Sequence, residues 1–132
     1  MKPKIGLITL GVTDFERSLA FYRDGLGFPV HQQMDDVVFF KLDGTWLSLY
    51  LREKLAEDAQ VPAEGNGFSG ITLAHNESSK EDVDATFARA LAAGAKEIKK
   101  PQDVFWGGYS GYFADLDGHL WEIAWNPFLD LT

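Results

Sequence analysis

The sequence predicts an α+β protein made of two tandem βαβββ modules that form a cupped, mixed sheet. The first observation behind this prediction is an internal repeat. A strand-like run, an amphipathic run that stops at glycine and three further strand-like runs occur in the same order twice. The second observation is an Asp-Gly pair ahead of the last strand of each copy, Asp43-Gly44 and Asp117-Gly118. One helix covers only one face of such a sheet, so we expect the two modules to pair and bury the other face.

Local signals define the elements of the first copy. Thr13 and Glu16 have capping-box spacing and predict the start of a helix, and Gly27 predicts its end. The strands that we expect around this helix lie at 5–10, 29–33, 37–42 and 46–51.

The second copy repeats these signals. Ser78 and Glu81 predict a helix start, and Gly94 predicts the helix end. The strands that we expect in this copy lie at 70–73, 95–99, 109–114 and 120–125.

Size and composition limit what the chain can be. The 132 residues are predicted to form one domain, with modules at 1–52 and 68–132 and a linker at 53–67. The formal charge of -8 argues against nucleic acid as a partner, because phosphates would be repelled. The chain has no cysteine and no apolar run as long as a membrane span, so we expect neither disulfides nor a membrane partner. These features predict a cytoplasmic protein whose partner is a small, mostly apolar molecule.

Alternation along the strands separates a helix-facing side from a pocket-facing side, because residues two apart share a face. Trp121 and Ile123 are bulky and should pack on a helix, which leaves Glu122 on the other face. A carboxylate on a buried face is costly unless it is paired or protonated. Glu122 is therefore the candidate catalytic base, and a structural carboxylate hydrogen-bonded to nearby hydroxyls is the alternative. The same parity predicts ligand-binding side chains at Thr9, Trp46, Ser48, Tyr50, Thr72 and Leu120.

A stretch rich in aromatic residues and glycine, residues 104–113, precedes a predicted strand. Glycine lets the backbone approach a ligand closely, and Trp and Tyr supply flat surface with a polar tip. We expect Trp106, Tyr109 and Tyr112 to bind a planar or apolar ligand. Ordinary core and turn packing is the alternative.

Two motifs resemble the vicinal oxygen chelate superfamily, which includes glyoxalase I, bleomycin-resistance proteins and extradiol dioxygenases. The first is TLGVTD at 9–14 followed by GLGF at 25–28, and the second is FADLDGHLWEIA at 113–124. The resemblance spans almost the whole chain. It implies paired βαβββ modules, a cup-shaped site and a homodimer.

Metal-dependent members of that superfamily have one ligand on each of four strands. The matching positions here are Leu7, Ser48, Gly70 and Glu122. Only Glu122 has a side chain suited to a divalent cation, and such sites typically need about three or more side-chain ligands. The resemblance therefore implies a divalent metal, whereas the residues predict no cofactor and retain Glu122 as the single ligand position.

Three functions are compatible with these residues. The favoured one is a protein that binds a small apolar or aromatic molecule, as bleomycin-resistance members do, without a complete metal site. The second is a superfamily enzyme: a lyase similar to lactoylglutathione lyase, a dioxygenase, or an isomerase that uses Glu122. The third is an interaction module whose cup is filled by its own side chains.

Overall fold

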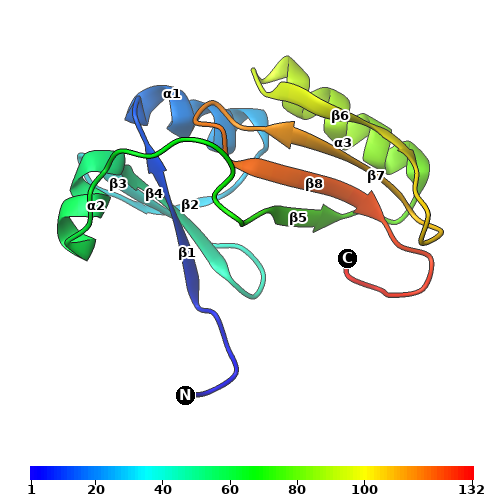
Figure 1. The fold of residues 1–132 in the computed structure, drawn as a ribbon, viewed down its shortest axis with the longest axis horizontal. Helices are drawn as coiled ribbons and strands as arrows, with labels where there is room; N and C mark the ends of the chain where they lie inside the picture. Colours follow the sequence, from blue (N-terminus) through cyan, green and yellow to red (C-terminus); the bar gives the residue numbers. More distant parts are fainter. The chain divides into compact units, whose positions relative to one another are not determined.

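The computed structural model describes residues 1–132 and divides them into two compact units, Met1–Gly67 and Phe68–Thr132. Each unit is a βαβββ module with its own four-stranded sheet (Figure 1). The predicted α+β fold of two tandem modules is therefore confirmed. No helix in the chain combines the length and the apolar character needed to cross a membrane.

The first unit has a mixed sheet in the order β1-β4-β3-β2, in which β1 and β4 are parallel and the other neighbours are antiparallel. Its first helix continues into a π-helical turn, Phe21–Gly25, which a hydrogen bond of 2.9 Å from the Leu26 N–H to the Phe21 carbonyl closes. A second helix occupies the start of the predicted linker. The elements are β1 (Leu7–Val12), α1 (Phe15–Ala20), β2 (Val30–Gln33), β3 (Val37–Phe40), β4 (Trp46–Leu51) and α2 (Arg52–Ala59).

The second unit repeats this topology in the order β5-β8-β7-β6, with β5 and β8 parallel. Its helix α3 lies along one face of the sheet (Figure 1). Phe87 on α3 meets Phe113 edge-on, with ring centroids 6.3 Å apart, and Phe113 stacks on Trp121. The elements are β5 (Leu73–Asn76), α3 (Lys80–Ala92), β6 (Lys96–Asp103), β7 (Tyr109–Ala114) and β8 (Leu120–Trp125).

Two helices begin one residue later than their capping boxes predicted. The N-cap of α1 is Asp14 and that of α3 is Ser79, and each side chain accepts a hydrogen bond of 3.1 Å from the backbone N–H three residues later. The caps predicted at Thr13 and Ser78 were therefore wrong. In each pair of adjacent cap-forming residues, it is the second that has extended backbone and reaches the first helical turn.

The opening strands also lie further along the chain than predicted. Gly70 has a φ of 81°, which an extended strand cannot contain, so β5 begins only at Leu73. As a result, Ala74 is the residue paired with Glu122, whereas Thr9 is paired with Ser48 in the first unit. The repeat would make Thr72 the counterpart of Thr9, but Thr72 precedes its strand, so this equivalence is wrong.

Strand β6 is longer than predicted. Its prediction ended before Pro101, but the strand continues to Asp103 through two irregularities of register. Pro101 is tolerated because it lies on an edge strand, within the irregularity between Lys99 and Gln102 where no ladder pair forms. This extension places more polar side chains beside β7.

Candidate functional site

The alternation predicted for the closing strands is confirmed. Leu47, Leu49, Trp121 and Ile123 are at most 7% exposed and form the helix-facing sides of β4 and β8. Glu122 lies between two of these residues and is half-buried on the opposite face of β8. The sequence pattern therefore placed the carboxylate on the correct face.

A cavity of about 310 Å³ opens on that face of the second unit. It is lined by residues of β6, β7 and β8 and by the turn between β6 and β7. Three predicted site residues meet there, namely Trp106, Tyr112 and Glu122. Its size is at the lower end of the range of roughly 300–1,000 Å³ that ligand pockets occupy.

Tyr112 and Glu122 form a cross-strand pair in this pocket. They are directly opposite each other on the antiparallel strands β7 and β8. Burial raises the pKa of the Tyr112 phenol, and the negative charge of Glu122 and a hydrogen bond to its carboxylate raise it further. The Tyr112 phenol therefore stays protonated at neutral pH beside the half-buried Glu122 carboxylate.

Trp106 is positioned by the glycines that follow it. The turn is closed by a hydrogen bond of 3.0 Å from the Val104 N–H to the Gly108 carbonyl. The indole lies so close to Gly108 that a Cβ there would be 2.0 Å from the ring. Only glycine permits this contact, which holds one aromatic surface at the pocket while 36% of Trp106 stays exposed.

Four polar residues of the pocket were missed by the sequence analysis. Lys99, Gln102 and Asp103 come from β6, and Ser110 comes from β7 and is 2% exposed. The prediction ended β6 at Lys99, so the residues beyond it had no assigned face. Ser110 could have been found from the sequence, because it lies two residues before Tyr112 and residues two apart on a strand share a face.

Tyr109 lies away from this pocket. It is three residues from Tyr112 on one strand and therefore faces the helix side. Its hydroxyl donates a hydrogen bond of 2.7 Å to Asp84 on α3, and Lys80 lies 5.6 Å from its ring centroid. Tyr109 thus anchors α3 to β7 and does not share the pocket with Trp106.

The hydrogen bond from Tyr109 to Asp84 predicts that the pKa of Tyr109 depends on the Asp84 carboxylate. The hydrogen bond to Asp84 is the main reason that the pKa of Tyr109 is raised to about 12, with burial as the next cause. Removing the carboxylate in Asp84→Asn should lower the pKa of Tyr109 toward its ordinary value of about 10. The phenolate signal of Tyr109, followed by NMR across alkaline pH, measures this change. An Asp58→Asn control on α2 should leave it unmoved, and an unchanged value in Asp84→Asn would refute the contact.

The candidates in the first unit pair with one another. The Ser48 hydroxyl donates to the Thr9 hydroxyl at 2.9 Å, and the two residues are opposite each other on β4 and β1. Trp46 and Tyr50 are half-buried on the same face as Ser48, and the Trp46 ring centroid lies 4.8 Å from that of His31. Their predicted role in ligand binding stays a prediction.

Besides Tyr109, two candidates of the second unit lie outside the cavity lining. Thr72 is exposed ahead of β5. Leu120 is half-buried on the same face as Glu122 and pairs with Ala114. The described cavity therefore contains only part of the predicted binding set.

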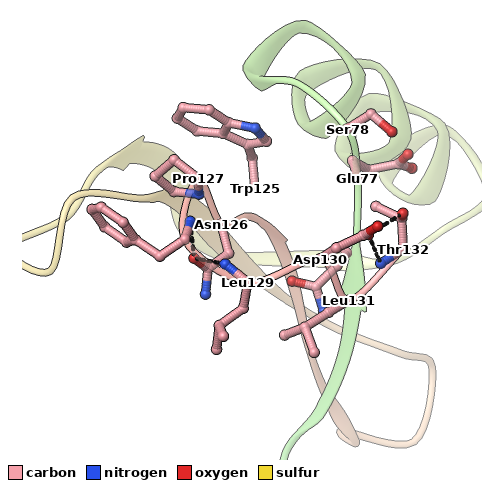
Figure 2. Close-up of a pocket in the computed structure, with 11 residues that line it drawn as sticks. Glu77, Ser78, Trp125, Asn126, Pro127, Leu129, Asp130, Leu131 and Thr132 are labelled. Carbon is pink, nitrogen blue, oxygen red and sulfur yellow. Dashed lines mark hydrogen bonds between the residues drawn. The ribbon is translucent and has the colours of Figure 1, made fainter.

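A larger cavity, of about 560 Å³, lies elsewhere in the second unit (Figure 2). It is lined by the end of β5 and by the segment after β8, and Figure 2 shows Trp125, Glu77 and Asp130 around it. Both acids already have partners in the protein: Glu77 accepts from Thr86, and Asp130 accepts from the N–H and hydroxyl of Thr132. None of the predicted site residues lines this cavity, so the pocket at Glu122 is the better candidate site.

The residues do not fit the divalent metal that the family resemblance implies. Leu7 and Gly70 have no donor atom in their side chains, and the Ser48 hydroxyl is bonded to Thr9. Glu122 is then the single carboxylate at the four matching positions. Neither unit gathers three or more His, Asp or Glu side chains that could hold a metal ion. The donor set therefore lacks the ligands that such cations typically need.

Comparison with known proteins agrees with the fold. A structure described as a glyoxalase-related enzyme from Fulvimarina pelagi has a TM-score of 0.88 and 35% identity, and the match covers 95% of this chain and 89% of that one. Uncharacterized protein YraH of Bacillus subtilis is 32% identical over 126 residues, which is 91% of this chain and 96% of YraH. Metallothiol transferase FosB of Staphylococcus haemolyticus is 26% identical over 125 residues, which is 90% of this chain and 81% of FosB.

A family model covers nearly the same range. The model of the Glyoxalase/Bleomycin resistance protein/Dioxygenase superfamily matches residues 4–123. This range contains every strand and helix of both modules except the last two residues of β8, and it includes the Glu122 position. The chain belongs to the glyoxalase/bleomycin resistance protein/dioxygenase superfamily.

Proposed function

We propose that this protein binds a small planar or apolar molecule in the pocket around Trp106, Tyr112 and Glu122, without a divalent metal. The observation that carries the proposal is the cavity of about 310 Å³ in which an aromatic surface lies beside the Tyr112–Glu122 pair. Small-molecule sites combine aromatic or apolar surface with a few convergent polar groups, and this cavity has both. The ligand would lie against the Trp106 indole and use Glu122 as an acceptor.

The acidic composition supports a small partner. A formal charge of -8 disfavours nucleic acid, because its phosphates would be repelled. One relative, FosB, is named a metallothiol transferase, but the four matching positions of this chain offer one carboxylate. We therefore favour ligand binding over metal-assisted chemistry as the function.

A second candidate function is proton transfer by Glu122. It is favoured by the Tyr112–Glu122 pair, in which a half-buried carboxylate is next to a phenol that keeps its proton. A base in such a pocket suits proton abstraction or isomerisation. A Glu122→Gln variant separates the two functions. If Glu122→Gln binds the ligand as tightly as the unmodified protein but no longer turns it over, the result would support catalysis. If the unmodified protein binds the ligand without turning it over, the result would support sequestration.

The test is calorimetric titration with indole, a neutral planar probe, in buffer treated with EDTA. Indole should bind the unmodified protein, and Trp106→Ala should weaken binding by about tenfold, because aromatic pairs contribute about 0.5–1.5 kcal/mol beyond the area they bury. Phe68→Ala is the matched control, since Phe68 is an exposed aromatic of the same unit outside the pocket.

Two results would contradict the proposal. Equal indole affinity in Trp106→Ala and the unmodified protein would place the ligand elsewhere. Indole binding that requires added zinc or nickel would overturn the metal-free part.

A further inference from the structure

The pocket contains a cation with no partner of its own. Lys99 is half-buried, lines the cavity and is opposite Tyr112 on the neighbouring strand. No hydrogen bond or ion pair engages its ammonium group. In contrast, Lys54 is paired with Asp36, and Lys80 with Asp103 at 2.6 Å. Lys99 is therefore an unpaired cation in a chain whose formal charge is -8.

The sheet places Lys99 in one row with the Tyr112–Glu122 pair. Register joins Lys99 to Tyr112 and Tyr112 to Glu122, so the three side chains come from adjacent positions on β6, β7 and β8. Neighbouring strands are about 4.8 Å apart, which separates the backbones at Lys99 and Glu122 by roughly 10 Å. Tyr112 lies between them, directly opposite Glu122. The other carboxylate in the lining, Asp103, is paired with Lys80 at 2.6 Å, whereas Lys99 has no ion pair.

We propose that the natural ligand is a planar organic acid whose carboxylate binds Lys99 while its flat part lies against Trp106. This inference rests on the proposed function and specifies its ligand class. Ser110 and Gln102 line the same cavity and offer further hydrogen-bond donors to the carboxylate. A charge-assisted hydrogen bond is stronger than a neutral one, so the acid is selected over a neutral analogue.

The experiment compares three probes that share one ring: indole, indole-3-acetate and tryptamine. Indole-3-acetate should bind about tenfold more tightly than indole, and tryptamine no more tightly than indole. Lys99→Met should remove the advantage of the acid and leave the affinity for indole unchanged. Lys100→Met is the matched control, because Lys100 is exposed and does not line the cavity. It should preserve the advantage.

The outcomes separate this inference from the proposed function. If indole and indole-3-acetate bind equally, or if the advantage survives in Lys99→Met, the acid does not use Lys99 and the inference is overturned. Equal binding is also the result expected if Lys99 pairs with Glu122 across Tyr112. Indole binding that depends on Trp106 would still support the proposed function in that case. If no probe binds, both fail.

Discussion

Replacing Gly108 with alanine is expected to remove most of the affinity for a planar ligand, although Gly108 offers the ligand no side chain. An added Cβ would lie 2.0 Å from the Trp106 ring and 2.8 Å from the carbonyl oxygen of Trp125. Real Cβ atoms do not approach other atoms so closely, so the Trp106 side chain must move out of its position at the pocket. Overpacking of this kind typically costs about 1–3 kcal/mol of stability. The affinity for the indole probe should fall by as much as it does in Trp106→Ala.

Calorimetry with indole measures this effect, and circular dichroism checks that the variant is folded. Gly6→Ala is the control, because no atom lies within 4 Å of a Cβ at that position. It should change neither affinity nor stability. Full indole affinity in a folded Gly108→Ala protein would mean that Trp106 does not form the binding surface. If Gly108→Ala does not fold, Trp106→Ala still tests the same surface.

Truncating Phe113 is expected to cause the largest loss of stability. Phe113 is 1% exposed and lies between Phe87 of α3 and Trp121 of β8, with ring centroids 6.3 Å from each. Phe113→Ala leaves a cavity at the centre of the second unit, which typically costs about 3–5 kcal/mol. The adjacent Tyr112 would then lose the rigid strand that places it beside Glu122.

Urea unfolding of Phe113→Ala measures this cost. Phe105→Ala is the matched control, because Phe105 is fully exposed and its truncation should change stability by less than about 0.5 kcal/mol. A loss below about 1 kcal/mol in Phe113→Ala would show that the aromatic cluster is not the core of this unit.

Much of the fold could be predicted because the sequence repeats its signals. The two Asp-Gly turns gave equivalent positions to Ser48 and Glu122, and both lie third in their strands. Alternation also assigned Trp121 and Ile123 to the buried face, since the period of two is a property of every strand. Both helix starts were predicted one residue too early, because adjacent residues such as Ser78 and Ser79 have equal capping chemistry.

The site was predicted only in part. Glu122, Tyr112 and Trp106 were identified, but Tyr109 lies on the helix-facing side because it is an odd number of residues from Tyr112. Lys99 was missed because the irregular register of β6 and the proline within it hide which face each residue occupies. Sequence periodicity cannot report a register that depends on the neighbouring strand.

The central claim is that a planar ligand binds the second unit beside Trp106 and Glu122. The most direct test is to follow the backbone amide signals by NMR during titration with indole. The largest shifts are expected at Lys99, at residues 104–112 and at Glu122. Shifts confined to residues 126–132, which line the larger cavity, or confined to the first unit, would contradict it.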